Sequence, residues 1–411
     1  MSGTAAATAI PSKTYDADAV KQILKDISTG GQRLEQNEPG SHETLLEQAR
    51  RLVVALESPV ESIYGLLIAE PSRLFAGRMA LDLKLFDTLA ADNGRPKSVA
   101  ELAAPRAASP KLVNRVLRHL AATKMLHQTG DEEYAQNEIS RFLEKPKLRE
   151  GIRYVFDAVE PSLNKLPEYL SRTHYQNPGN ANDGPFQYAH KTQNYWTWLE
   201  QHPRVLQAFQ DYLAGVREDR PNFMDPGFYP VKERLVEGLR HDGDAAVFVD
   251  VGGGEGHALA EFNEKVPTWT GRLVLQEQEP VVQIAKMQPH ASLIELTVHD
   301  FFRPQPLKGA RAYYMRYILH DWPDEECRTI LRHLRDAMEP GYSKILIHEC
   351  VVADRDAPWQ HTALDIYMMA LFATQERTER EWRELLSSVG LTITGIWSKG
   401  TGNLSLIEAM V

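Results

Sequence analysis

The chain has 411 residues, of which 43% are apolar and 25% charged, a composition typical of a well-packed protein large enough for two domains. Its formal net charge of −10 argues against nucleic acid as a partner, because binding to phosphates needs a basic surface. The N-terminus lacks the basic start and apolar core of a secretory signal, and the apolar runs fall far short of the ~20 residues that span a bilayer, so we expect a cytoplasmic protein with no membrane partner.

The two cysteines, Cys327 and Cys350, are too few for a disulfide framework. Their separation fits no zinc-ligand pattern. Each is interpreted as a small buried apolar residue in a reducing compartment.

The first part of the chain is expected to form an N-terminal arm over residues 1–40, with a short helix over Ala17–Ile27. From Glu43 to Ala91 the apolar residues recur with helical spacing, which predicts further helices. These helices open a domain that we expect to cover residues 41–150.

The second half of this domain carries the pattern of a winged helix. Ser98 and Glu101 form a capping-box pattern before a short helix, and Ser109 with Pro110 begins a second one. Residues 125–135 then predict a hairpin around a turn. Such a module either binds DNA or serves as a dimerisation or lid module, and the acidic charge of the chain favours the second function.

Residues 151–240 are helical in pattern and rich in aromatic side chains, and we expect them to connect the two domains. Most of these aromatics are predicted to be core, and some to line a substrate pocket, because aromatic side chains supply a large apolar area around a planar ligand. They are Tyr154, Phe156, Tyr169, Tyr175, Phe186, Tyr188, Tyr195, Trp196 and Trp198.

Strands alternate with helices over residues 241–411, which predicts a Rossmann-like, doubly wound α/β sheet. Ligands of such a sheet bind at the carboxyl ends of its strands. The predicted strands are 245–251, 273–275, 312–315, 345–347, 391–396 and 404–409. The predicted helices are 258–266, 281–286, 325–337 and 378–388.

A glycine-rich turn, Asp250 to Gly256, follows the first of these strands and opens a helix. Glycines let the backbone turn tightly and let a ligand approach closely. The dinucleotide fingerprint needs a glycine where this chain has His257, so the pattern is instead Asp followed by G-x-G-x-G. Asp250 and Glu255 flank the loop, which disfavours a pyrophosphate and suits a ligand with a cationic sulfonium and amine. Glu277, at the end of the next strand, is expected to bind a ribose diol.

With these motifs the chain resembles the class I S-adenosylmethionine-dependent O-methyltransferases, in particular the caffeic acid O-methyltransferase-like family and its fungal natural-product branch. The resemblance covers roughly residues 74–411. It implies S-adenosylmethionine as the cofactor, and a homodimer in which the winged-helix module helps to shape the partner's substrate pocket. Glu277 and Arg316 stand where the family commonly has Asp and Lys, so both charges are kept. Together with Asp250, the cofactor-binding residues expected are Gly252, Gly254, Glu277, Asp300, Phe301 and Arg316.

The stretch from Arg316 to Glu326 follows a predicted strand and carries His320 beside the expected cofactor crevice. A phenol has a pKa near ~10 and is a poor nucleophile until a base removes its proton, a role that imidazole fills near neutral pH. A carboxylate bonded to the far ring nitrogen would fix the tautomer and stabilise the imidazolium. The resemblance supplies two candidates, Glu349 and Glu376. On the alternative interpretation Glu349 belongs to a buried ion pair and Glu376 is a solvated charge.

The acceptor pocket is expected near the segment Ile366 to Phe372, which would otherwise be a core helix. Methionines there would hold an aromatic ring through soft contacts. Asp321 either contacts the substrate or caps the next turn, and Asp324 is predicted to be the N-cap of the following helix. The substrate-binding residues expected are Asp321, Met368, Met369 and Phe372.

The expected activity is transfer of the methyl group of S-adenosylmethionine to a phenolic or enolic hydroxyl of a small aromatic or polyketide-like natural product. No metal is expected, because His320 supplies the base and no carboxylate cluster of the catechol type is matched. One alternative is a pericyclase on the same scaffold, which binds the cofactor and transfers nothing. Retention of a base with two orienting acids favours transfer, and the charge disfavours a third alternative, a DNA-binding regulator.

Overall fold

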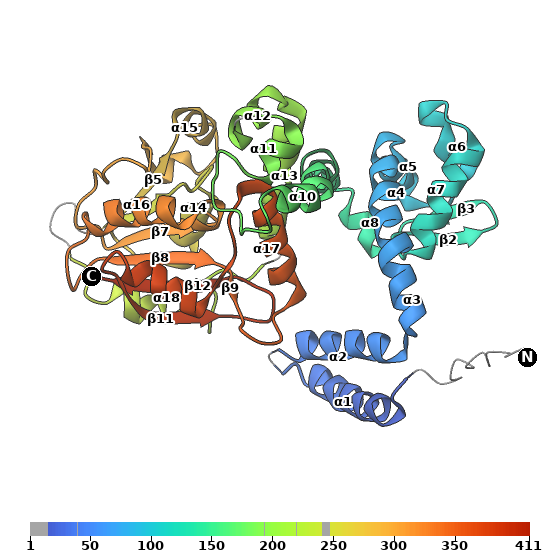
Figure 1. Cartoon of the computed structure of the whole chain (residues 1–411), viewed down its shortest axis with the longest axis horizontal. Helices are drawn as coiled ribbons and strands as arrows, with labels where there is room; N and C mark the ends of the chain where they lie inside the picture. Colours follow the sequence, from blue (N-terminus) through green and yellow to red (C-terminus); the bar gives the residue numbers. More distant parts are fainter. Residues whose placement is uncertain (1–14, 39, 193, 219, 241–246) are drawn as a thin grey trace, which may run out of the picture. The chain divides into compact units, whose positions relative to one another are not determined.

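The computed structural model describes residues 15–38, 40–192, 194–218, 220–240 and 247–411. The chain forms two compact units, Met1–Phe156 and Asp157–Val411 (Figure 1). Residues 1–14 and 39 of the predicted arm lie outside the described residues, as do residues 241–246 at the start of the predicted C-terminal domain.

Two helices packed against each other open the first unit, α1 (Ala17–Glu35) and α2 (Ser41–Leu56). The Asp16 carboxylate caps α1, because it accepts hydrogen bonds from two backbone N–H groups of the first turn at 3.0 and 3.1 Å. α1 begins at Ala17 as predicted and continues to Glu35, beyond the predicted end at Ile27. The chain continues through α3 (Pro59–Tyr64) and the π-helical turn η1 (Gly65–Ala69) into α4 (Glu70–Asp82).

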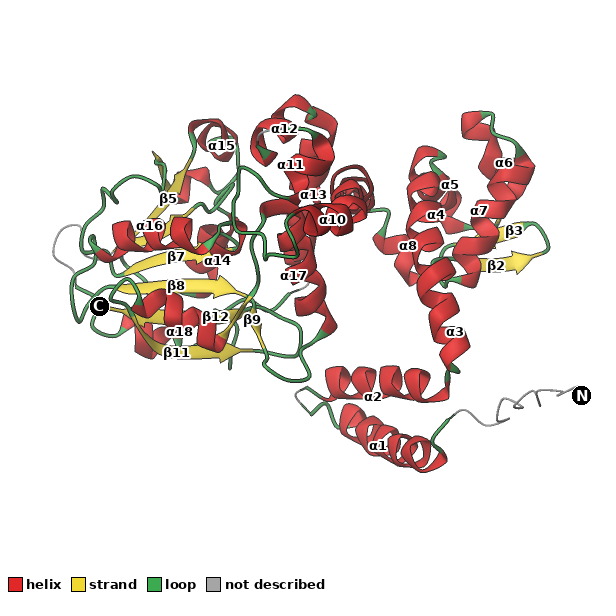
Figure 2. Cartoon of the chain, viewed as in Figure 1, coloured by secondary structure: helices red, strands yellow, loops and turns green. Residues whose placement is uncertain are grey.

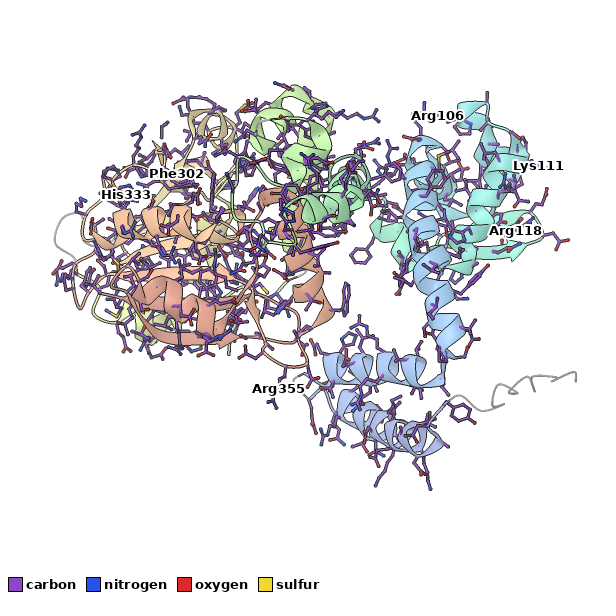
Figure 3. All side chains as sticks on the ribbon, in the orientation of Figure 1. Arg106, Lys111, Arg118, Phe302, His333 and Arg355 are labelled. Carbon is purple, nitrogen blue, oxygen red and sulfur yellow. The ribbon has the colours of Figure 1, made fainter. Side chains whose placement is uncertain are left out.

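The predicted winged-helix module follows, and its capping box is confirmed. Ser98 Oγ accepts a hydrogen bond from the Glu101 N–H at 3.3 Å, and the Glu101 carboxylate accepts one from the Ser98 N–H at 2.9 Å. A third strand, β1, joins the hairpin. It has only two residues, which is too short for the sequence pattern to predict a strand. Figure 3 shows Lys111 and Arg118 on the surface of this module. Its elements are α5 (Leu85–Ala90), η2 (Asp92–Gly94), β1 (Lys97–Ser98), α6 (Val99–Ala103), η3 (Ala104–Arg106), α7 (Pro110–Ala122), β2 (His127–Gly130), β3 (Glu133–Ala135), α8 (Glu138–Phe142) and α9 (Pro146–Tyr154).

Large apolar side chains are exposed along α2, α3 and η1. Contiguous apolar surface of this kind usually marks an interface with another molecule. Among the described helices no single one is long and apolar enough to cross a bilayer, although α2 together with α3–α4 meets the length and composition criteria as a pair bent by 108°. The exposed side chains, called the apolar face below, are Val53, Val54, Leu56, Val60, Ile63, Tyr64, Leu66, Leu67 and Ile68.

Helices rich in aromatic residues begin the second unit. The Phe186 ring stacks on His190 with centroids 4.1 Å apart and meets the edge of Tyr195 at 4.9 Å. Phe186 and Tyr195 are buried, as expected of core aromatics, whereas Tyr175 is 76% exposed. These elements are η4 (Val155–Val159), α10 (Glu160–Arg172), α11 (Pro185–His190), α12 (Tyr195–Gln201), α13 (Pro203–Glu218) and η5 (Lys232–Val236).

A seven-stranded sheet of order β11-β12-β8-β7-β4-β5-β6 forms the core of the second unit. The five strands from β8 to β6 run parallel, and β12 is antiparallel to both of its neighbours. The predicted Rossmann-like α/β fold is confirmed. Sequence analysis missed the edge strand β6, whose short Glu-Leu-Thr-Val segment has no apolar run. The strands are β4 (Val247–Val251), β5 (Arg272–Glu277), β6 (Glu295–Val298), β7 (Ala312–Arg316), β8 (Lys344–Glu349), β11 (Thr392–Ser398) and β12 (Ser405–Met410).

Helices flank this sheet (Figure 2). One correction concerns α16, which begins at Asp324 with Pro323 as its N-cap, so the prediction of Asp324 as the N-cap is wrong. Its carboxylate instead accepts a hydrogen bond from Arg377 at 2.9 Å. The elements are α14 (His257–Lys265), α15 (Glu279–Ala285), η6 (Ala291–Leu293), η7 (Leu319–Asp321), α16 (Asp324–Arg335), β9 (Val351–Val352), α17 (Trp359–Phe372), β10 (Arg377–Thr378) and α18 (Glu379–Ser387).

A buried carboxylate on β12, Glu408, ties the segment around η5 to the sheet. It accepts hydrogen bonds from the Tyr229 hydroxyl at 2.6 Å and from Lys344 Nζ at 2.9 Å, and it pairs with Arg234. Burial raises the pKa of Glu408, but the hydrogen bonds from these donors have the larger effect and lower the pKa to about 2. The group therefore stays ionised, because its charge is fully compensated.

We expect the apolar face to hold two copies of the chain together. Ile63→Glu with Leu67→Glu should shift the protein from dimer to monomer in light scattering, because each substitution puts a charge into a surface that needs an apolar partner. Both side chains are more than half exposed, so the protomer itself loses no packing. Met287→Glu, at a side chain that is 85% exposed in the second unit, is the control and should remain dimeric. A doubly substituted protein that stays dimeric would contradict the prediction.

Candidate active site

Glycines shape the loop between β4 and α14. Gly252, Gly254 and Gly256 have φ of +72°, +63° and +82°, in the left-handed region that other residues avoid. A Cβ on Gly252 would lie only 2.7 Å from Ile318 Cδ1, which belongs to the segment after β7. The loop therefore presents bare backbone at the carboxyl ends of two neighbouring strands, where ligands of this fold bind.

A carboxylate at the end of β5 is bonded to this loop. Glu277 Oε1 accepts a hydrogen bond from the Gly254 N–H at 3.1 Å, and Oε2 accepts one from the Gln278 N–H at 2.8 Å. Burial raises the pKa of Glu277, and these two hydrogen bonds oppose the rise. A pocket at this edge brings together four of the predicted cofactor residues, Gly252, Glu277, Asp300 and Phe301. Its other lining residues are Gln276, Gln278 and His299.

Asp250 and Arg316, also predicted for the cofactor, do not line this pocket. Asp250 is 1% exposed, and its carboxylate lies directly against the backbone of Gly253, where a Cβ would collide with it. It therefore braces the glycine loop from inside, whereas the sequence suggested a rim position. The Arg316 guanidinium lies 5.9 Å from the ring centroid of Tyr317.

The segment after β7, which carries His320, is bonded from two sides. From β8, the Glu349 carboxylate accepts hydrogen bonds from the backbone N–H groups of Ile318 and Leu319, at 2.9 and 2.6 Å. From β10, Arg377 donates to the carbonyl oxygens of Leu319 and Trp322, both at 3.1 Å. These contacts fix the backbone on which His320 stands.

His320 is 6% exposed and is bonded to a second buried acid. Its Nδ1 lies 2.7 Å from Glu376 Oε1, and its Nε2 lies 3.4 Å from Asp321 Oδ1. The Glu376 backbone N–H donates to Asp365 at 2.8 Å, which holds the residue in place. Of the two acids proposed to orient the ring, Glu376 contacts it, whereas Glu349 contacts the backbone before it.

Three carboxylates set the protonation of this site. Burial lowers the pKa of His320, but Glu376, Asp321 and Glu349 raise it more, to about 10. Burial raises the pKa of Asp321 to about 7, against the effect of the His320 charge. The ring is therefore protonated at neutral pH. Since this pKa exceeds the ordinary 6.5, the contribution of His320 to folding stability is complete below about pH 6.5 and is lost as the pH rises toward about 10.

A concavity of about 150 Å³ opens beside Asp321 and Phe372, two of the four residues expected to contact the acceptor. This volume is smaller than the ~300–1,000 Å³ of typical small-molecule sites. Met368 is buried, and neither it nor Met369 lines this concavity. The other lining residues are Ala181, Asn182, Gln187, Asn194, Tyr195, Trp196, Trp322, Glu326 and Leu371.

Sequence reasoning missed two residues that support the site, Arg377 and Asp365. Arg377 directly follows the candidate acid Glu376, so its position next to that residue could have marked it as part of the site. Asp365 lies within α17 and carries no pattern of its own. Its contact with the Glu376 backbone arises only from the packing of α17 against the segment before β10.

Comparison with known proteins identifies the chain. An O-methyltransferase domain model matches residues 241–392, and an O-methyltransferase dimerisation domain model matches residues 74–145. The O-methyltransferase mpaG of Penicillium roqueforti is 36% identical over 395 residues, which cover 95% of this chain and 98% of the relative. The chain belongs to the O-methyltransferase family.

Two solved structures are similar to this chain, and each match covers 95% of this chain and 99% of the other chain. One is described as "A Pericyclic Reaction enzyme" and has 30% identity and a TM-score of 0.86. The other is LepI in complex with S-adenosylmethionine, with 31% identity and a TM-score of 0.85. The chain is thus a fungal-type, S-adenosylmethionine-dependent O-methyltransferase. The dimerisation match supports a homodimer and does not support the DNA-binding alternative for the winged helix.

The residues present fit S-adenosylmethionine. Gly252, in the left-handed region, presents bare backbone to the pocket, and Glu277 adds a partly buried carboxylate beside it. Asp300 and Phe301 supply an acidic and an apolar group in the same pocket, which suits an adenosine.

Gly252→Ala should weaken binding of S-adenosylhomocysteine by about tenfold or more in isothermal titration calorimetry. The added Cβ both strains a positive φ and presses on Ile318. Gly341→Ala is a matched control, since Gly341 has φ +74° with no atom within 4 Å of the place that a Cβ would occupy, and its affinity should be unchanged. Equal affinities of the two variants would contradict this assignment of the loop.

Proposed function

We propose that this O-methyltransferase methylates a phenolic or enolic hydroxyl of a small aromatic or polyketide-like natural product, with His320 as the general base. The observation that carries the proposal is the buried hydrogen bond of 2.7 Å between His320 Nδ1 and Glu376 Oε1. It leaves Nε2 as the ring nitrogen that can accept a proton from an acceptor.

The cofactor supplies an electrophilic methyl group when it is bound. Gly252, Glu277, Asp300 and Phe301 would hold it, because they line one pocket beside the glycine loop. Ile318 touches Gly252 and stands two residues before His320, so the base and the cofactor pocket are joined by one short segment. This proximity favours an acceptor hydroxyl that meets both groups at once.

The side chains around His320 then manage the proton. In its neutral form the ring takes the hydroxyl proton on Nε2, and Glu376 stabilises the resulting imidazolium through Nδ1. The raised pKa of about 10 makes His320 a strong base. Since a phenol also has a pKa near ~10, proton transfer from the phenol to the ring is nearly balanced in free energy. A positive charge bound at the glycine loop lowers this pKa and favours the neutral ring.

A pericyclase is the second candidate, and two observations favour it. A related structure of 30% identity is described as a pericyclic reaction enzyme. The pKa of about 10 also keeps His320 protonated at neutral pH, and a protonated ring can donate a hydrogen bond to a reacting carbonyl. The two functions differ in one product, because only methyl transfer releases S-adenosylhomocysteine.

The deciding experiment incubates the protein with methyl-labelled S-adenosylmethionine and a panel of phenols that includes the cognate pathway intermediate. We expect labelled product and S-adenosylhomocysteine. His320→Ala should abolish turnover while its affinity for S-adenosylhomocysteine in calorimetry stays within about twofold, whereas His127→Ala, an exposed histidine of β2, should turn over normally. Full turnover by His320→Ala would remove it as the base, and no release across the panel would favour the pericyclase.

Glu376→Gln should change the pH profile of kcat/KM. In the wild type we expect kcat/KM to rise from pH 7 toward about 10, as His320 loses its proton. Loss of the Glu376 charge lowers the pKa of His320, so the rising limb should move to lower pH, and the plateau should fall by at least about tenfold because the ring is less well oriented. An unmoved limb would mean that Glu376 does not act through His320.

A further inference from the structure

Tyr317 joins the candidate base to a second cationic group. It adopts φ +55°, a left-handed conformation that is strained for an aromatic residue. Its ring centroid lies 5.0 Å from that of His320, and its hydroxyl accepts a hydrogen bond from Arg220 Nη1 at 3.4 Å. The ring thus spans the distance between the imidazole and a guanidinium.

Arg220 lies where elements around the candidate site meet. Burial raises the pKa of Tyr212 on α13, of Tyr317 after β7 and of Cys350 after β8, and the Arg220 charge opposes the rise in each case. On α17, burial lowers the pKa of His361 and the Arg220 charge contributes to that lowering. The guanidinium charge therefore acts on groups from four separate segments of the second unit.

The bonding of Arg220 is weak for a half-buried cation. Among the described side chains no carboxylate lies within ion-pair distance of it, and the contact of 3.4 Å with Tyr317 is long for a hydrogen bond. Arg377 shows the usual arrangement in this unit, since it binds the Asp324 carboxylate and two carbonyl oxygens. Arg220 retains donors for another oxygen, and a shielded charge gains most from an anionic partner.

We propose that Arg220, together with the Tyr317 hydroxyl, binds a carboxylate of the acceptor, so that the substrate is a phenolic or enolic compound that also carries an acidic group. The planar guanidinium matches the two oxygens of a carboxylate. The inference rests on the proposed function for the hydroxyl that reacts, and it adds the group that orients the acceptor. The Tyr317 ring sets the spacing between the anionic end of the acceptor and His320.

The test compares binding of orsellinic acid and its uncharged methyl ester to protein saturated with S-adenosylhomocysteine, by isothermal titration calorimetry. Wild type should bind the acid at least about tenfold more tightly than the ester, as expected for a charge-assisted hydrogen bond. Arg220→Gln should bring the ratio of the two affinities close to one. Arg220→Lys should keep part of the ratio, because it keeps the charge and loses the planar fork.

Arg355→Gln is the matched control, because this exposed arginine lies between β9 and α17, on the surface of the same unit (Figure 3), and its loss should leave the ratio unchanged. Three outcomes would overturn the proposal. Wild type could bind acid and ester equally, or not bind the acid at all. Arg220→Gln could also show an unchanged affinity ratio at an unchanged melting temperature. Binding can be measured without methyl transfer. If the protein releases no S-adenosylhomocysteine in the labelling experiment, but Arg220→Gln still abolishes the preference for the acid over the ester, the proposed function is refuted and the carboxylate-binding proposal stands.

Discussion

The active-site arrangement depends on one buried carboxylate that accepts two backbone hydrogen bonds. Glu349 receives the N–H groups of Ile318 and Leu319 and fixes the chain as it leaves β7. Arg377 binds the carbonyl oxygens of the same turn from the opposite side. Tyr317, directly before these anchored residues, adopts a left-handed conformation. Without the contacts of Glu349 and Arg377 the backbone on which His320 stands would not be defined.

The same acids that hold this turn also determine its proton chemistry. A buried histidine that faces no carboxylate has a lowered pKa, as His348 shows, since burial and the nearby Arg316 charge keep its pKa well below the ordinary value. His320 is equally buried and shifts the other way because it faces three carboxylates. A scaffold of this kind can supply a base or a hydrogen-bond donor according to the charge bound next to it. This offers a physical reason why related chains include both O-methyltransferases and a pericyclic reaction enzyme.

The candidate cofactor pocket and the concavity expected to take the acceptor lie in different parts of the second unit. The cofactor pocket is built from loops at the ends of β4, β5 and β6, where bare backbone and Glu277 leave little freedom for substitution. The concavity beside Asp321 is lined largely by the helical connector and α17. Most of its residues, like Arg220, lie outside the stretch from Arg316 to Glu326 that carries His320, whereas Asp321, Trp322 and Glu326 belong to it. Acceptor specificity can therefore change while the glycine loop and His320 stay the same.

The sequence by itself determined the features that depend on near neighbours. The capping box at Ser98, the strand and glycine loop at Asp250, and the candidate base His320 in the segment after β7 are all local patterns. Contacts between distant residues were decided only by the tertiary structure, because burial and side-chain direction follow from packing. Glu376 lies 56 positions after His320, and the family resemblance favoured it and Glu349 equally, yet only Glu376 contacts the ring. Asp250 is likewise buried beneath its loop, and Arg220 meets Tyr317 across 97 positions, since the sheet and its helices bring these segments together.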